Sequence, residues 1–447
     1  MRALLASSIG VTCAAAVLLP LSPNALAANG PTTRERVSPA GGTQALPLVP
    51  LSRSGPGAAR GDRAQAAWRG LPAKTVKPFS LLGVSWPNAD ERLHGTVEVR
   101  TRAGDTGRWG QWRRLDTHGA DAPDRGARER HGSQARGATA PLWVGASDGV
   151  RVRVRPEEGG GGLPRGLRLE LVAPGGERTT TPVTRARVSE RAGQPQVRAP
   201  QEPGAVASAA VNAELAPMGS SEVPALTREE TRSRMAAGGS PRGVSATRAA
   251  ARPHIVLRKG WGADESLREG QFDYGKTVRA AFVHHSADSD AYTCAEAPSV
   301  IRGIYRYHTT SLKWRDIGYN FLVDKCGKIY EGRAGGVERP VRGAHTLGFN
   351  DDTTGVAVLG DYSSSKASGA AVRAVSQLTA WKLGLFGVDA RSRTTLTSAG
   401  GGKFDRGERV ELNAVSGHRD GFTTSCPGDR LYGQLPDIRS EAGRLQG

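Results

Sequence analysis

The spacing of hydrophobic residues differs between residues 76–176 and residues 251–447. In the first region, Thr96–Arg102 and Val150–Val154 alternate apolar and polar side chains, which is typical of half-buried strands. Gly-rich turns separate these short runs. We therefore predict a small all-β domain, an antiparallel sandwich, over residues 76–176, with a charged low-complexity insertion over residues 117–140.

Strand-like and helix-like patterns are interleaved in residues 251–447. The pattern predicts strands at 277–284 and 354–360, helices at 298–308 and 370–386, and a hairpin at 319–331. Gly387 follows the last of these runs as a helix stop. Because strands and helices mix along the chain, we predict an α/β domain with a mixed sheet and flanking helices.

The remaining segments lack an apolar period. Residues 28–75 are rich in Gly, Pro, Ala and Arg and read as a disordered arm, and residues 177–250 read as a flexible linker. Residues 1–27 have a charged start, the apolar run Leu4–Leu21 and the small-residue site Ala25–Ala27, as a signal peptide does. No later stretch reaches the ~20 apolar residues of a membrane span. We expect a secreted or cell-wall protein without a transmembrane segment, and a monomer.

The formal net charge of +18 lies mostly in the N-terminal part of the chain. Residues 251–447 contain 27 Lys and Arg against 22 Asp and Glu, so they contribute little of the excess. For an exported protein, anionic cell-wall polymers and membrane surfaces are the natural partners of such charge. Solubilising charge explains the excess equally well. We expect no nucleic-acid partner, because no recognition motif is present.

Three cysteines remain after removal of a signal peptide, and an odd number in an oxidising compartment favours one disulfide and one special thiol. Cys294 and Cys326 lie near turns of one domain and can pair, which leaves Cys426 free.

Cys426 and His418 share the loop 416–429, and the two side chains can converge on one metal ion if the loop folds back. Zinc favours such ligands, and a catalytic zinc takes three from the protein. The third is expected from His284 or His285, where an apolar run ends; only one should bind, because strand neighbours face opposite ways. Alternatively, Cys426 is a small buried hydrophobe or a disulfide partner.

Other polar residues near these motifs each have two interpretations. Tyr319 is either a donor to a developing oxyanion or an ordinary buried tyrosine. His345 is either a ligand or a substrate contact. His308, on the apolar face of a predicted helix, fits a core or supporting role better.

With these residues in place, the C-terminal domain resembles the peptidoglycan recognition protein and type 2 N-acetylmuramoyl-L-alanine amidase family, which includes the phage T7-type lysozyme. Six blocks occur in family order over roughly residues 252–430. They are F-V-H-H-S (282–286), W-R-D-I-G-Y-N-F (314–321), I-Y-E-G-R (329–333), G-A-H-T (343–346), G-V-A-V-L-G (355–360), and S-G-H-R (416–419) with C-P-G (426–428).

The resemblance implies zinc ligands at His284, His418 and Cys426, with Tyr319 assisting catalysis. It implies hydrolysis of the amide between the lactyl group of N-acetylmuramic acid and L-Ala of peptidoglycan. Some family members bind peptidoglycan without cleaving it and typically lack the cysteine ligand, so a non-catalytic recognition module is the alternative. A structural wall protein anchored by its basic N-terminal half is a third reading.

Substrate contacts are expected from His345, Arg333 and Thr424. Phage members carry Lys where this chain has Thr424, which leaves the detailed acid and base roles open. Arg333 fits a structural salt bridge equally well. The N-terminal β region resembles accessory regions of exported amidases.

Overall fold

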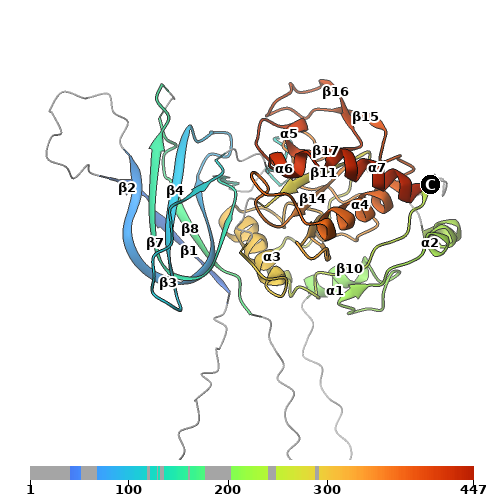
Figure 1. Ribbon diagram of the computed structural model, residues 1–447, viewed down its shortest axis with the longest axis horizontal. Coiled ribbons are helices and arrows are strands. Elements are labelled where there is room, and N and C mark those ends of the chain that lie inside the picture. The colour runs from blue at the N-terminus through green and yellow to red at the C-terminus, as the bar shows by residue number, and fades with distance from the viewer. Residues whose placement is uncertain are drawn as a thin grey trace, which may run out of the picture. The chain divides into compact units, whose positions relative to one another are not determined.

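The computed structural model describes residues 41–51, 68–117, 121–127, 129–130, 135–159, 162–176, 203–239, 248–286 and 291–447. The expected signal peptide (residues 1–27) lies outside them. Two large sheets organise the described chain: an eight-stranded sheet from its N-terminal part and a seven-stranded sheet from its C-terminal part (Figure 1). Both belong to the unit formed by residues 39–447.

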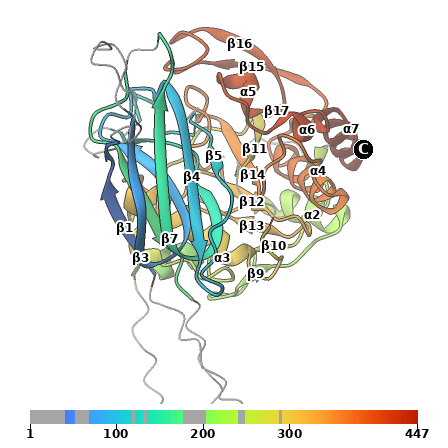
Figure 2. The same cartoon turned by 60° about the vertical axis from the view of Figure 1, so that its left-hand side comes forward.

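The N-terminal sheet is antiparallel, with the order β1-β8-β3-β7-β4-β5, while β2 and β6 also pair with β3. Figure 2 brings β3, β7 and β4 toward the viewer. The predicted all-β domain is confirmed, but its strands form one sheet and not a sandwich of two separate sheets. The strands are β1 (Gly42–Pro47), β2 (Val49–Pro50), β3 (Arg69–Trp86), β4 (Gly95–Ala103), β5 (Arg113–Leu115), β6 (Gly137–Ala138), β7 (Leu142–Pro156) and β8 (Arg168–Ala173).

The expected disordered arm over residues 28–75 is wrong for its described part. Strand β1 pairs with β8 along its whole length, and β2 pairs with the start of β3. Leu48 and Leu71 are buried in the core of this sheet. The sequence pattern concealed these strands because Gly, Pro and Arg interrupt the apolar alternation, whereas a strand ladder uses main-chain groups that every residue except Pro can supply.

The C-terminal sheet is mixed, with the order β17-β11-β14-β12-β13-β10-β9. Neighbours β17, β11, β14 and β12 run parallel, whereas β12 and β13 form an antiparallel hairpin. The strands are β9 (Glu222–Val223), β10 (Ile255–Val256), β11 (Ala280–His285), β12 (Phe321–Val323), β13 (Ile329–Glu331), β14 (Thr353–Val358) and β17 (Val415–Gly417). The predicted mixed α/β architecture is confirmed.

Helices cover both faces of this sheet (Figure 1). Helices α4 (Gly369–Gly384) and α7 (Leu435–Gln446) share one apolar core with alternate residues of β11, β12 and β14. Helix α3 (Ala297–Arg306), which continues as a π-helical turn over Tyr307–Ser311, packs with residues of the opposite face. Because both faces are covered, β11 and β14 are buried over their whole lengths. The C-terminal segment also contains the hairpin β15 (Arg393–Thr397) and β16 (Arg409–Asn413) and the short helices α5 (His418–Gly421) and α6 (Asp429–Tyr432).

Helix α3 also joins the two sheets. Leu81, Trp143 and Val172 of the N-terminal sheet belong to the same apolar cluster as α3. The hydroxyl of Tyr307 donates a hydrogen bond to the carbonyl oxygen of Thr139 at 3.1 Å. A Cβ atom on Gly83 would lie 2.2 Å from that hydroxyl, so glycine permits this close approach.

The expected flexible linker over residues 177–250 is wrong for residues 203–239. They contain α1 (Pro203–Ala210), β9 and α2 (Arg228–Arg234), and α2 continues as a π-helical turn over Met235–Gly239. Strand β9 extends the C-terminal sheet by pairing with β10. Helix α2 begins with a capping box between Thr227 and Glu230. Such elements are stabilised by polar contacts and pairing, so their few large apolar residues did not reveal them.

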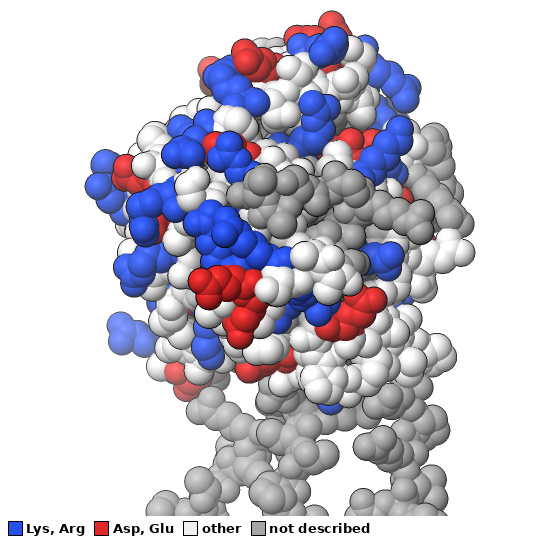
Figure 3. All heavy atoms as spheres, turned by 90° about the vertical axis from the view of Figure 1, so that its right-hand side faces the viewer, with Lys and Arg blue, Asp and Glu red and all other residues white. Residues whose placement is uncertain are grey.

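The described surface carries charges of both signs. Figure 3 shows Lys and Arg interspersed with Asp and Glu on the face that it presents. Among the described residues, we find no helix with the length and apolar character that a membrane crossing requires.

Candidate metal centre

Two histidines stand at the carboxyl ends of neighbouring parallel strands. Val283 of β11 pairs with Gly417 of β17, and the next residue of each chain segment is a histidine, His284 and His418. The strand ends therefore bring together two side chains that lie 134 positions apart. Ligands of open α/β sheets collect at this edge.

Cys426 reaches the same point through the loop after α5. The amide of Arg419 donates to the carbonyl oxygen of Cys426 at 3.0 Å, which folds the loop back on the helix. Gly428, two residues later, has a φ of 84°, and a Cβ atom there would lie 2.3 Å from the main chain of Tyr362. Glycine is thus required where the loop closes against its neighbour.

The three side chains form a compact donor cluster. The Nδ1 atoms of His284 and His418 are 3.0 Å apart, and the Cys426 sulfur is 3.9 Å from Nδ1 of His284. One ligand atom from each residue lies within 4.8 Å of the others. Zinc bonds of about 2.0–2.3 Å to a tetrahedral set place donors about 3.3–3.8 Å apart. The donors of this cluster lie near that spacing, and two imidazoles with a thiol are a donor set that suits zinc.

Burial sets the protonation of the cluster. It lowers the pKa values of His284 and His418 to about 3, so both rings are neutral and offer lone pairs. Burial also raises the pKa of the Cys426 thiol well above its usual value. A bound dication would act against this, because metals bind the thiolate form.

His345 supports the cluster from behind. Its ring is fully buried, and its Nδ1 lies 3.3 Å from Nε2 of His284, with the Thr346 hydroxyl 3.4 Å from the same nitrogen. The Asn350 side-chain oxygen accepts hydrogen bonds from the amides of both His345 and Thr346. Contacts of this kind orient a ligating ring. His345 therefore contacts His284, and it does not line the pocket into which His418 and Cys426 open.

The other candidate histidines, His285 and His308, line the neighbouring pocket, but their rings have partners outside the donor cluster. The Nδ1 atom of His285 accepts a hydrogen bond from the amide of Tyr362 at 3.4 Å and lies 3.7 Å from the Asp361 carboxylate. His308 is buried, and its Nδ1 accepts from the amide of Gly318 at 3.1 Å. His308 therefore braces the turn that leads to Tyr319, in line with the supporting role expected for it.

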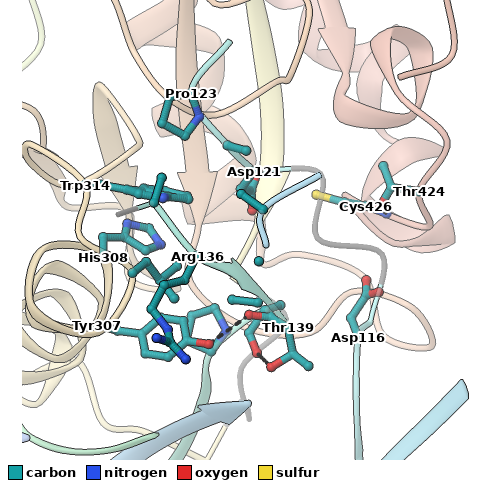
Figure 4. A pocket seen from close by; sticks show the side chains of 18 of the residues that line it. Asp116, Asp121, Pro123, Arg136, Thr139, Tyr307, His308, Trp314, Thr424 and Cys426 are labelled. Carbon is teal, nitrogen blue, oxygen red and sulfur yellow. Dashed lines mark hydrogen bonds between the residues drawn. The ribbon is translucent and has the colours of Figure 1, made fainter. Parts of the chain in front are cut away.

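Tyr319 faces the donor cluster. Its ring centroid is 5.4 Å from that of His284, and its hydroxyl donates a 2.8 Å hydrogen bond to the carboxylate of Asp121. The other Asp121 oxygen lies 3.2 Å from Nδ1 of His284 and 3.4 Å from Nδ1 of His418. A carboxylate from the N-terminal domain thus stands beside the cluster (Figure 4).

Asp121 belongs to a stretch that we call the acidic segment, defined as residues 121–127, 129 and 130, between β5 and β6. Sequence reasoning missed it and recorded only a charged insertion. Hydrophobic periodicity carries no sign of such a segment, because its contacts are polar and span about 200 positions.

The acidic segment also contacts the predicted substrate residue Arg333. The Glu129 carboxylate accepts two hydrogen bonds from the Arg333 guanidinium, at 2.9 and 3.0 Å. Arg333 is buried and also donates to the carbonyl oxygen of Ile317. Thr424 lines a pocket together with His418, Cys426 and Asp121 (Figure 4). Of the predicted site residues, His418, Cys426 and Thr424 line this pocket, whereas His284 and Tyr319 contact its lining residues His418 and Asp121.

The other two cysteines in the described part of the chain form the disulfide Cys294–Cys326, with Cα atoms 6.2 Å apart. It ties the segment before α3 to the turn between β12 and β13. Cys426 is a free, buried thiol.

Comparison with known proteins identifies both parts of the chain. Residues 274–429 match the family model of N-acetylmuramoyl-L-alanine amidase, and residues 35–204 match one described as Rv3811 N-terminal galactose-binding domain-like. Peptidoglycan-recognition protein SA of Drosophila melanogaster is 33% identical over 185 residues, which are 41% of this chain and 78% of that protein. The chain belongs to the peptidoglycan recognition protein and type 2 amidase family.

Other family members match a comparable share of this chain. Peptidoglycan-recognition protein SC2 of Drosophila simulans is 29% identical over 181 residues, which are 40% of this chain and 84% of that protein. The solved structure of bumblebee PGRP-SA is 26% identical, covers 41% of this chain and 93% of its own, and has a TM-score of 0.33. Each of these matches covers about two fifths of this chain.

Proposed function

We propose that this protein acts on peptidoglycan as an exported, zinc-dependent N-acetylmuramoyl-L-alanine amidase. It hydrolyses the amide between the lactyl group of N-acetylmuramic acid and L-Ala of the stem peptide. The observation that carries the proposal is the convergence of His284, His418 and Cys426, all buried, within 4.8 Å. Two neutral imidazoles and a thiol form a donor set that suits zinc.

In this proposal His284, His418 and Cys426 hold the metal. Bound zinc would supply an activated water and polarise the scissile carbonyl. The chain's own contribution is to fix the donors. The contacts of His345 and Thr346 with Nε2 of His284 leave Nδ1 of that ring for the metal.

Tyr319 is the proposed catalytic side chain. Its hydroxyl is a hydrogen-bond donor beside the donor cluster, where negative charge develops on the lactyl oxygen during attack on the amide. Thr424 lines the pocket next to Cys426 and offers a hydroxyl to the substrate. Thr424 has no basic side chain, so proton transfer to the leaving amine falls to other groups or to water.

A non-catalytic recognition module is the second candidate. It is favoured by one observation, that the acidic segment covers the donor cluster and engages Tyr319 and Arg333. It is opposed by the presence of all three donors, since family members that bind peptidoglycan without cleaving it typically lack the cysteine ligand.

The remaining parts of the proposal concern place and partners. The amidase reaction requires export to the cell wall, for which residues 1–27 are suited. The Arg residues on the outer face of β7, Arg151 and Arg155, are exposed and suit anionic wall polymers. We propose this as an accessory wall contact of the N-terminal sheet.

The test is digestion of purified peptidoglycan by the zinc-loaded protein, with mass spectrometry of the released material. We expect stem peptides with a free L-Ala amino group. Release should disappear in Cys426→Ala and after chelation, and it should persist in Thr423→Ala, an exposed position of the same loop. Sedimentation with the wall without any release by the zinc-loaded protein would overturn the amidase and leave the recognition module.

A further inference from the structure

The acidic segment fastens the N-terminal domain to the proposed active site at three points. Each point uses one carboxylate: Asp121 beside the donor cluster, Asp124 further along, and Glu129 at Arg333. Asp124 and Glu129 are 7% and 6% exposed, so water does not solvate them. Burying charged groups is costly unless each has a partner, and the C-terminal domain supplies hydrogen-bond donors at all three points.

The first point engages the proposed catalytic groups. One Asp121 oxygen accepts from the Tyr319 hydroxyl at 2.8 Å. The other is a buried atom without a hydrogen-bond donor, and it faces the Nδ1 atoms of His284 and His418 at 3.2 and 3.4 Å. Those nitrogens are the ones that the metal would use. The carboxylate therefore lies beside the proposed ligands and holds the hydroxyl that would otherwise face the substrate.

The second point is an anion site built from an amide and a side chain. Asp124 accepts from the amide of Gly348 at 2.6 Å and from the Asn350 side-chain nitrogen at 2.9 Å. The same Asn350 nitrogen donates to the carbonyl oxygen of Ala122, so it grips the segment twice. The Asn350 oxygen holds the amides of His345 and Thr346, which contact His284.

The third point is a bidentate ion pair. Both Glu129 oxygens face the Arg333 guanidinium, and one also accepts from the amide of Arg315 at 2.9 Å. Paired hydrogen bonds of this type are among the strongest polar contacts in proteins and recognise carboxylates in particular. Arg333 sits in a buried position that any other carboxylate could reach only after Glu129 leaves.

The three points have a common chemistry. Each pairs a carboxylate of the acidic segment with donors of the C-terminal domain, and the segment lines the pocket shared with His418, Thr424 and Cys426. A stem peptide also presents free carboxylates. We propose that the acidic segment is an internal stand-in for the anionic stem peptide, and that it must leave the pocket before peptidoglycan can reach the donor cluster. This inference rests on the proposed function.

Such docking is displaceable. The charge-assisted contacts favour it, but they order a stretch of chain that has little apolar burial of its own, and ordering costs conformational entropy. The segment therefore slows turnover without abolishing it, and a substrate with carboxylates at matching positions competes for the same donors.

The test uses the full zinc-loaded chain and the variants Glu129→Gln and Asp124→Asn, which keep the side-chain size and remove the charge. Glu158→Gln, an exposed position of the N-terminal domain, is the matched control. Two quantities are measured: the rate at which a colorimetric chelator withdraws zinc, and the rate of hydrolysis of peptidoglycan sacculi. Hydrogen exchange of residues 121–130 reports docking directly.

We expect both rates to rise by about tenfold or more in Glu129→Gln and to stay unchanged in the control. They should not rise in Asp124→Asn, because burial disfavours the charge on Asp124 and the neutral side chain docks at least as tightly. Exchange of residues 121–130 should rise in step. Unchanged zinc withdrawal together with unchanged or slower hydrolysis in Glu129→Gln would overturn the proposal and assign the segment to catalysis or folding. Faster zinc withdrawal without hydrolysis by any form would support the stand-in and overturn the amidase assignment.

Discussion

The two large sheets of this protein handle polar residues in opposite ways. In β7 of the N-terminal sheet, Val150, Val152 and Val154 are buried, whereas Arg151 and Arg155, which alternate with buried positions, are exposed. In β11 of the C-terminal sheet, all residues from Ala280 to His285 are buried. One face of β7 is open to solvent at these positions, whereas the C-terminal sheet is covered on one face by α4 and α7 and on the other by α3 and the hairpin β15–β16.

This difference determines where chemistry can lie. An open antiparallel face offers positions along the whole strand for charged side chains. A parallel sheet covered on both faces leaves only its edge, where strands end, and there His284 and His418 stand side by side. The acidic segment joins the two arrangements, because it leaves the N-terminal sheet and carries carboxylates to that edge.

The largest effect is expected at the strand ends. His418→Ala should lower both zinc affinity and hydrolysis by more than about 100-fold, because loss of a group that merely orients a ligand already costs about 10–100-fold. The exposed His254→Ala should change neither. Zinc content by mass spectrometry and sacculus hydrolysis measure the two quantities. If His418→Ala and His254→Ala had the same zinc content and the same rate of hydrolysis, the placement of the site at the strand ends would be contradicted.

Tyr319→Phe removes a hydroxyl from the same edge and leaves the ring. We expect kcat to fall about 100-fold with zinc content unchanged, the usual cost of one oxyanion donor. Tyr274→Phe, whose hydroxyl donates to the carbonyl oxygen of Gly335, is the matched control. Loss of zinc in Tyr319→Phe would instead make this tyrosine a structural residue.

The unfolding free energies of single variants should also distinguish the two sheets. In β7, Val152→Ala should cost about 2 kcal/mol of unfolding free energy, whereas the neighbouring Arg151→Ala should cost less than about 0.5 kcal/mol. In β11, the neighbours Phe282→Ala and Val283→Ala should both be costly, at about 3 and 2 kcal/mol. Chemical denaturation measures all four. If either substitution in β11 left the unfolding free energy unchanged, burial of both faces of this strand would be contradicted.

The smallest effect concerns pH and the acidic segment. Burial raises the pKa of Asp124 from 3.8 to about 6, although its contacts with Gly348 and Asn350 and the charge of Arg342 oppose the rise. Burial also raises the pKa of Asp121. The docked carboxyl of Asp124 therefore holds its proton more tightly than the free one, so protonation favours docking.

The sign follows from these values. The contribution of Asp124 protonation to docking is complete below the free pKa of 3.8 and is lost as the pH rises through about 6. Docking should weaken about tenfold between pH 5 and pH 7, since one pKa unit corresponds to about 1.4 kcal/mol. Hydrogen exchange of residues 121–130 at the two pH values measures it. An equally large change in Asp124→Asn would assign the pH dependence to another group.

Sequence patterns predicted the elements that apolar side chains define. Strand β11 and helix α4 were found because Val283, Leu378 and Trp381 mark buried faces. The donor cluster was found from the chemistry of His418 and Cys426 and from family resemblance. Strand β9 and helix α2 were missed because a few polar caps and main-chain pairs stabilise them.

Asp121 shows a further limit of prediction from one sequence. Its significance depends on tertiary contacts with Tyr319 and His284, which lie 198 and more than 160 positions away. If the same stretch of sequence were exposed to solvent, it would be an ordinary charged loop. Resemblance to the family did not reveal it, because the six matching blocks begin at Phe282.

The amidase assignment is decided by the position of bond cleavage. Peptidoglycan is digested by the zinc-loaded protein in water enriched in the heavy oxygen isotope, and the products are analysed by mass spectrometry. We predict one heavy oxygen in the lactyl carboxyl of N-acetylmuramic acid and a free amino group on L-Ala. Label in a peptide carboxyl group or at a sugar carbon, or no labelled product at all, would contradict the assignment.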